Sequence, residues 1–124
     1  MDIFKFILIS LLAVFAPIQA VMITVGALIF GDLILGMWAA KKRGEQITSA
    51  AMRRTVTKMF VYQLAIMTGF LLEFYIMGEI LPIAKLVAGV IGMVEFKSLL
   101  ENATAITGTD FKDLIKKLGS KNDQ

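Results

Sequence analysis

The sequence predicts an all-α integral membrane protein of helical hairpins, with about four transmembrane helices and a C-terminal amphipathic helix. Three observations predict this class. Hydrophobic residues make up 57% of the 124 and charged residues only 19%, whereas soluble domains have about 45–50% and about 25%. The mean hydropathy is +0.76. Residues 6–40 contain one ionisable side chain, Asp32, and residues 59–100 contain five.

The residue types that are missing exclude several classes of chemistry. The chain has no cysteine and no histidine, which removes disulfides, thiol nucleophiles, Cys/His zinc sites and imidazole acid–base catalysis. The sequence also has no glycine-rich phosphate loop and no nucleophile elbow. We therefore expect no enzyme activity, no cofactor, no metal and no nucleic-acid partner.

The N-terminal apolar run predicts a helical hairpin. A membrane-spanning helix needs roughly 20 apolar residues, and residues 3–40 are about twice that length. Pro17 and Gln19 are the only breakers in this run, so we expect spans at about 2–16 and 19–40. The first span is short and can lie partly in the interface. The first twenty residues also resemble a signal peptide, but another apolar stretch follows them, so we expect them to be retained.

A polar loop and two further spans follow. The loop, 41–56, contains many cations and one acid. Thr48 or Ser49 can cap a helix that begins near Ala50, because a hydroxyl accepts from the free N–H groups of a first turn. That helix is predicted to continue into a third span at about 57–77. Gly78 and Pro82 then mark a short turn, and a fourth span follows at about 83–103.

Cations predict the orientation, because loops rich in Lys and Arg stay in the cytoplasm. These cations lie in the loop, just after it and in the tail, and we expect them to face the cytoplasm or lipid headgroups. They are Lys41, Lys42, Arg43, Arg53, Arg54, Lys58, Lys112, Lys116 and Lys117. Four spans in a transmembrane domain, 1–104, place both termini in the cytoplasm of a bacterial inner membrane. A three-span alternative, with 1–16 on the membrane, puts the N-terminus outside or at the surface.

The tail, 105–124, is predicted to hold a cytoplasmic amphipathic helix. Phe111, Leu114, Ile115 and Leu118 recur at i, i+3, i+4 and i+7, which places them on one helical face. Thr109 is expected to cap this helix and Gly119 to end it. The apolar face can pack on the protein's own bundle or lie on anionic lipid, and we favour the membrane surface.

Ionisable side chains inside the spans are candidates for function. A charge at the bilayer centre costs roughly 2.5–3.5 kcal/mol on insertion scales, so such a residue faces the bundle interior, a partner or water. Asp32, Gly36 and Ala40 share one face of the second span, and the two small residues allow another backbone to approach closely.

The fourth span has a similar row of small residues, Ala84, Ala88 and Gly92, spaced four apart on one face. It also carries a polar stripe. The stripe consists of Glu95, Ser98, Glu101 and Asn102. These groups can satisfy one another within one bundle, or they can face a subunit interface or a wet lumen. Glu73, in the third span, has no obvious cationic partner in its helix and can line water.

Three segments resemble the phage holin family of the phage-lysis and toxin-secretion type. The segments are "GDLILGMWAAKKRGE", "SAAMRRTVTKMF" and "GMVEFKSLLENATAITG". They match an Asp-x-x-x-Gly-x-x-Ala-Ala motif, a basic linker with Ser, Arg and Lys, and a Glu-x-x-Ser-x-x-Glu-Asn motif. The matching residues are Asp32, Gly36, Ala39, Ala40, Ser49, Arg53, Arg54, Lys58, Glu95, Ser98, Glu101 and Asn102. Leu35 departs from the family, where a small hydroxyl residue is common.

The resemblance implies a homo-oligomer in the lipid bilayer of the host inner membrane. Such proteins open lesions through which an endolysin reaches the peptidoglycan, and no direct contact with the endolysin is required; relatives in toxin loci are thought to release toxins. Two other classes stay open on the residues alone. Intramembrane acids also mark small ion channels and transporters, and a structural anchor could bind a soluble partner through its loop and tail.

Overall fold

The computed structural model describes residues 2–122, and every regular element in that range is helical. This confirms the predicted all-α class. The α-helices are α1 (Ile3–Phe15), α2 (Gln19–Lys42), α3 (Ser49–Leu71), α4 (Ile83–Thr107) and α5 (Phe111–Lys121). A short 3₁₀ helix, η1 (Ala16–Ile18), joins α1 to α2, and a π-helical segment, η2 (Leu72–Ile76), extends α3.

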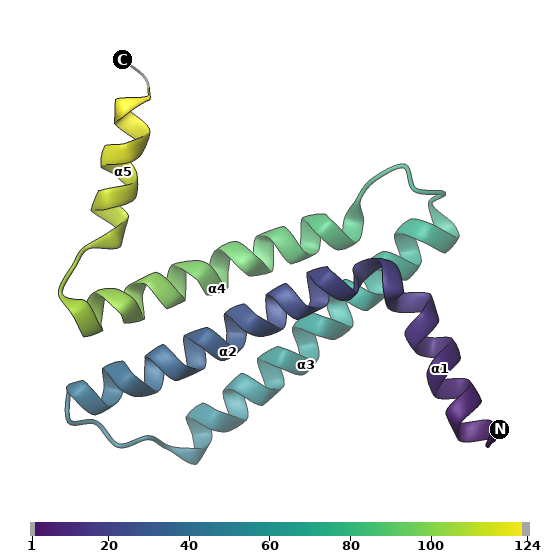
Figure 1. Cartoon of the computed structure of the whole chain (residues 1–124), viewed down its shortest axis with the longest axis horizontal. Coiled ribbons are helices and arrows are strands. Elements are labelled where there is room, and N and C mark those ends of the chain that lie inside the picture. The colour runs from purple at the N-terminus through teal and green to yellow at the C-terminus, as the bar shows by residue number, and fades with distance from the viewer. Residues whose placement is uncertain (1, 123–124) are drawn as a thin grey trace.

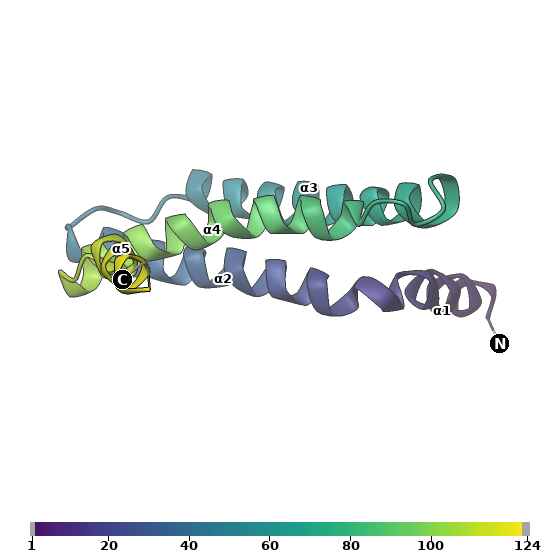
Figure 2. The same cartoon turned by 90° about the horizontal axis from the view of Figure 1, so that it is seen from above.

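Three long helices, α2, α3 and α4, lie side by side and form a bundle (Figures 1 and 2). Helices α2 and α4 run in the same direction and α3 runs against both (Figure 1). One end of the bundle carries the loop 43–48, and we call it the loop end. The other end carries the turn 77–82, and we call it the turn end. Most of the predicted cytoplasmic loop 41–56 is thus helical, because α3 begins at Ser49.

Local chemistry accounts for the helix boundaries. The Thr48 hydroxyl accepts from the Ala51 N–H and starts α3. Gly108 ends α4 with φ +74°, a left-handed conformation that glycine adopts without a steric penalty. The predicted Thr109 cap of α5 is wrong: Asp110 accepts from the N–H groups of Lys112 and Asp113. The predicted stop at Gly119 is wrong as well, because α5 continues to Lys121.

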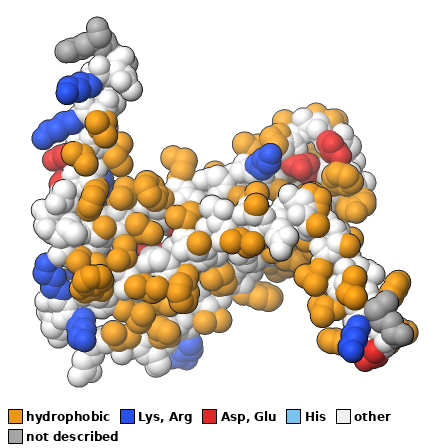
Figure 3. All heavy atoms as spheres, in the orientation of Figure 1, with side chains coloured by type: hydrophobic (Ala, Val, Ile, Leu, Met, Phe, Trp, Pro, Cys, Tyr) orange, Lys and Arg blue, Asp and Glu red, His pale blue; other side chains and the backbone are white. Residues whose placement is uncertain are grey.

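The bundle core follows residues that recur every three or four positions on each helix. Ile29 of α2 and Ile66 of α3 have no exposed surface, and Ala84 of α4 has 1%. Large hydrophobic side chains cover the outside of the bundle, and cations gather at the loop end (Figure 3). An apolar exterior of this size indicates a protein surrounded by lipid.

The terminal helices do not pack along the bundle. Helix α1 leaves the turn end and runs across the bundle direction, while α5 leaves the loop end and also runs across it (Figures 1 and 2). Helix α1 buries no residue and exposes large apolar side chains along its length. The hairpin predicted for 2–16 and 19–40 therefore has a turn, η1, but its two arms do not lie side by side.

Two continuous stretches of the described chain are long and apolar enough to cross a membrane. They are Ile3–Lys42, with 40 residues, and Ser49–Ile76, with 28. Helix α4 has 25 residues, but it carries four charged side chains. These are Lys85, Glu95, Lys97 and Glu101. With these charges, α4 is not among the two stretches that are apolar enough to cross a membrane by composition alone.

Candidate functional site

Asp32 is buried in the bundle, with 9% of its surface exposed. Its Oδ1 atom accepts a hydrogen bond of 2.8 Å from Asn102 Nδ2 of α4. Gly36 lies one turn further along α2, and a Cβ atom there would lie 3.4 Å from Asn102 Nδ2. A side chain at position 36 would therefore crowd the amide that holds Asp32. The small residue below the acid admits a neighbour from the same chain.

Lys58 of α3 joins Asp32 to a second buried acid, Glu95 of α4. Its Nζ atom lies 3.1 Å from both carboxylate oxygens of Glu95 and 3.5 Å from Asp32 Oδ2. Glu95 is only 2% exposed. We call Asp32, Lys58 and Glu95 the ion cluster. It holds one cation between two carboxylates, one residue from each bundle helix.

Helical periodicity brings the ion cluster together. On α2, Asp32 follows Ile29 by three residues on the buried face. On α3, Lys58 precedes Ile66 by eight residues, which is close to two turns and the same face. On α4, Glu95 follows Ala88 by seven. Each charged group thus occupies a core position, where a soluble bundle would place an apolar residue.

A cavity of about 580 Å³ opens above the ion cluster at the loop end. Asp32 and Asn102 form part of its floor, and Arg43 and Glu45 of the loop line its mouth. Arg43 Nε donates to Glu45 Oε1 at 3.0 Å. This hydrogen bond and the arginine charge lower the pKa of Glu45 below its usual range. The cavity gives the polar half of the core a route to water, because its lining is mainly polar and charged.

The small residues of α4 pack within the chain. Ala84 and Ala88 belong to the core, and a Cβ atom at Gly92 would lie 3.6 Å from Leu28 of α2. Ala40 and Ser98 line the cavity next to Asp32. In the structure, these predicted helix-contact positions therefore serve contacts among α2, α3 and α4 of one chain.

Glu73 lies far from the ion cluster, at the turn end. It belongs to the π-helical segment η2, and its Oε1 atom accepts from the backbone N–H of Ala84 at 3.4 Å. Helix α4 begins after Pro82, whose side chain cannot cap it. The Glu73 carboxylate supplies this missing acceptor, and its charge favours the positive end of the helix dipole.

Two predicted assignments need correction. Glu101 does not continue the buried polar stripe, because it is exposed and pairs with Lys112 of α5 at 2.9 Å. Lys58 does not lie among the lipid-facing cations, because it is held between Glu95 and Asp32. In the sequence, Lys58 shares a helical face with Thr55, Tyr62 and Ile66, and this spacing could have predicted that Lys58 faces the bundle interior.

The remaining predicted cations stay near the loop end or on α5. Lys42 donates to the Ile106 carbonyl, which ties α2 to the last turn of α4. Arg53, Arg54, Lys41, Lys116 and Lys117 are exposed. Among residues 2–122, no group of three or more acidic side chains could hold a metal ion.

One polar contact had no sequence signal beyond the residue type. Gln63 of α3 donates from Nε2 to the Met22 carbonyl of α2 at 2.9 Å. Gly26 lies beside it, since a Cβ atom there would be 3.5 Å from Gln63 Nε2. This bond joins α2 to α3 in the apolar half of the bundle.

Comparison with known proteins assigns the family. A family model described as the bacteriophage holin family matches residues 9–121. This chain belongs to the bacteriophage holin family. The match covers the whole three-helix bundle and all of α5, and it confirms the resemblance carried by the three sequence segments. No curated protein and no solved structure matches the chain.

Family membership defines the general class. The holin family is a non-enzymatic, pore-forming family of membrane proteins, so this member is not an enzyme. It is a phage holin-type membrane protein, in agreement with its apolar exterior.

Proposed function

We propose that this chain oligomerises in the bacterial inner membrane and opens lesions that release an endolysin, so that the host cell lyses. The observation that carries the proposal is the radial distribution of side chains. Large apolar residues face outward along α2, α3 and α4, while Asp32, Lys58 and Glu95 face inward. An assembly that lines water needs polar groups of this kind at membrane depth.

The polar contacts of the single chain describe a resting state. Asp32 and Glu95 are held by Asn102 and Lys58, and the core beyond them is closed by Ile29 and Ile66. A continuous water path through one chain is thus blocked. In the proposed mechanism, copies associate, the three helices separate at the loop end, and the residues of the ion cluster turn toward a shared lumen. The endolysin passes through without a direct contact.

We propose three membrane crossings, made by α2, α3 and α4. The cations at the loop end, on the last turn of α2 and the first turns of α3, and those of α5 favour a cytoplasmic loop end and C-terminus. Helix α1 has 13 residues, about 20 Å at 1.5 Å per residue, which is short of a hydrocarbon core of about 30 Å. Its crosswise direction favours the alternative in which it stays at the outer surface.

A dye-release assay tests the function. Purified protein is added to liposomes that contain markers of graded size. Release of protein-sized markers is expected for a holin. Flux of ions alone would favour a channel, and no flux at all would favour a structural anchor.

Cysteine labelling in intact cells tests the topology, because the chain has no cysteine. The variants Asp2→Cys, Ala50→Cys, Ile80→Cys and Ser120→Cys are treated with an impermeant thiol reagent. Three crossings predict labelling at positions 2 and 80 only. Labelling at position 80 alone would restore the four-crossing prediction with both termini in the cytoplasm.

A further inference from the structure

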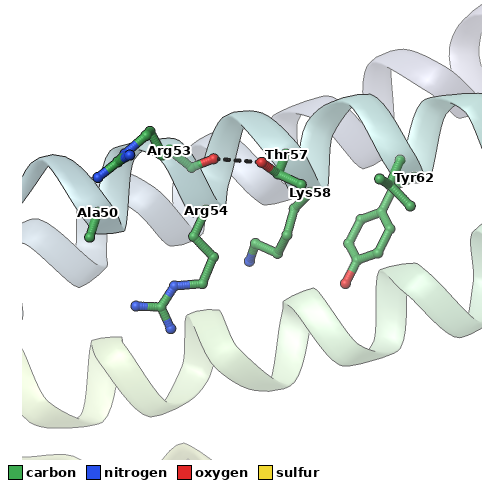
Figure 4. A pocket seen from close by; sticks show the side chains of 7 residues that line it. Ala50, Arg53, Arg54, Thr57, Lys58 and Tyr62 are labelled. Atoms are coloured by element: carbon green, nitrogen blue, oxygen red, sulfur yellow. Dashed lines mark hydrogen bonds between the residues drawn. The ribbon is translucent and has the colours of Figure 1, made fainter.

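A groove of about 580 Å³ opens along the side of α3 that faces α4 at the loop end. Its lining includes Arg53, Arg54, Lys58, Val61 and Tyr62. The side chains of Arg54, Lys58 and Tyr62 point from α3 toward α4 (Figure 4). The groove is separate from the cavity between the three helices, although Arg54 and Lys58 contribute to the lining of both.

The groove has a strong charge at one end. None of its lining side chains is acidic. Arg53 and Arg54 are exposed, and neither forms an ion pair with any residue in the range 2–122. A guanidinium presents several N–H groups in a plane, which suits the oxygens of a phosphate. Both arginines line the loop end of the groove, where Arg54 points toward α4 and the Arg53 side chain runs along α3 toward Ala50, so this end is cationic (Figure 4).

The other end of the groove is apolar. Val61 and Tyr62 come about two turns after Arg53 and Arg54 on α3, toward the middle of that helix. The order along the helix is therefore cationic at the loop end and apolar toward the middle. A phospholipid at the same depth has the same order, with its phosphate at the membrane surface and its acyl chains inside.

We propose that this groove binds one anionic phospholipid from the cytoplasmic leaflet. The phosphate lies against Arg53 and Arg54, and an acyl chain lies along Val61 and Tyr62. The inference rests on the membrane placement given under the proposed function. It goes beyond general attraction to the membrane surface, because it assigns the headgroup to two arginines of one helix.

The bound phosphate would also lie near Lys58, whose ammonium group holds Glu95 and Asp32. Lys58 is therefore unsuited as a test position, since its removal disturbs the ion cluster as well. Arg53 and Arg54 are suited, because both are exposed and outside the core. The test variants are Arg53→Gln/Arg54→Gln and the charge-conserving Arg53→Lys/Arg54→Lys.

The experiment is native mass spectrometry of the full-length chain in detergent, titrated with phosphatidylglycerol or with phosphatidylcholine of the same acyl chains. The wild-type chain is expected to retain one phosphatidylglycerol in preference to phosphatidylcholine. At about 1 kcal/mol per cation, Arg53→Gln/Arg54→Gln should weaken phosphatidylglycerol binding roughly thirtyfold. Arg53→Lys/Arg54→Lys keeps the charge but loses the planar fork, so it should bind with an intermediate affinity.

The matched control is Lys116→Gln/Lys117→Gln, which removes two exposed cations from α5. Retained phosphatidylglycerol binding in this control supports the groove. Equal losses in the two glutamine variants, or equal binding of the two lipids, would overturn the inference. Equal binding of glycerophosphoglycerol, the headgroup without acyl chains, would overturn the role of Val61 and Tyr62.

Dye release and lipid binding, both measured on the wild-type chain, separate this inference from the proposed function. If the wild-type chain releases the markers but shows no preference for phosphatidylglycerol, only the lipid site is rejected. Intact lipid preference in a wild-type chain that releases no marker rejects the lesion-forming function alone.

Discussion

The two halves of the bundle core are built from opposite chemistry. At the turn end, Ile29, Ile66 and Phe70 pack against Ala84 and Ala88. At the loop end, the same three helices meet through the ion cluster and through the hydrogen bond between Asp32 and Asn102. The first half packs mainly apolar side chains, while the second half borders a cavity of about 580 Å³.

This difference shows how helices find one another in lipid. Acyl chains are as apolar as leucine, so burying an isoleucine between helices gains only its packing contacts. A carboxylate at membrane depth is costly unless it is paired or reaches water, so its contacts favour particular helix faces. The apolar half therefore contributes close packing, and the polar half contributes the specific alignment of α2, α3 and α4.

The largest effect is expected for Lys58→Met, which keeps the length of the side chain and removes its charge. Asp32 and Glu95 would then share the core without a cation. Removing one partner of a buried ion pair costs about 3–5 kcal/mol. Unfolding of the purified protein by increasing SDS in mixed micelles, followed by the fluorescence of Trp38, should show this loss. Trp38 is the only tryptophan.

The control for that comparison is Lys41→Met, an exposed cation of α2. It should unfold at the wild-type SDS fraction. The double variant Lys58→Met/Glu95→Gln removes one of the stranded charges, so it should be more stable than Lys58→Met. If Lys58→Met and Lys41→Met unfold together, the ion cluster does not hold the loop end.

A smaller effect is expected for Asp32→Leu, because Lys58 keeps Glu95 as its partner. The loss of the bond to Asn102 leaves a part-buried amide without this acceptor, at up to about 1–3 kcal/mol. Asp32→Asn keeps shape and hydrogen bonding and should lie between Asp32→Leu and the wild type. Crosslinked oligomers and lysis timing in cells give the functional readout. If both variants abolish lysis while their oligomers stay normal, the charge of Asp32 serves ion conduction, and the hypothesis of a small ion channel is preferred.

A still smaller effect is expected for Ile66→Ala in the apolar half. In a soluble protein such a truncation costs about 2–5 kcal/mol, of which a large part is the transfer from water. In lipid that part is lost, so about 1–2 kcal/mol should remain for the cavity. The same SDS titration measures it. A loss for Ile66→Ala greater than that for Lys58→Met would reverse the proposed roles of the two halves.

The smallest effect is expected for Lys112→Gln, which breaks the bridge to Glu101. Both side chains are about half exposed, at 46% and 54%, so water screens the ion pair and it contributes little to stability. Proteolysis of the 108–110 linker should be slightly faster, while unfolding of the bundle should not change. A large change in bundle stability would show that α5 supports the bundle.

The sequence predicted the features that depend on local patterns. Apolar runs located the long helices, the turn near Pro17 corresponds to η1, and Thr48 was one of two predicted caps. The Asp110 cap was missed because Thr109 and Asp110 are both good caps, and only the backbone geometry decides between them.

The candidate site was predicted in its residues but not in its contacts. Asp32, Glu95 and Asn102 were identified because charged and amide groups are rare in lipid. Their pairing depends on the rotation of each helix about its own axis, which a single sequence does not specify. Lys58 was grouped with the cytoplasmic and lipid-facing cations because it follows Arg53 and Arg54 at the end of a basic stretch. The crosswise direction of α1 depends on the 3₁₀ turn at Ala16–Ile18, whose geometry residue types do not define.

The two crosswise helices also have a consequence for the choice of membrane. The 20 residues of α2 from Gln19 to Trp38 cover about 30 Å, the thickness of a typical hydrocarbon core. Helices α1 and α5 leave the bundle at its opposite ends (Figure 1). A thicker bilayer would draw both end helices into the hydrocarbon, and a thinner one would lift at least one of them off it. The length of the acyl chains thereby affects how the two end helices lie against the membrane.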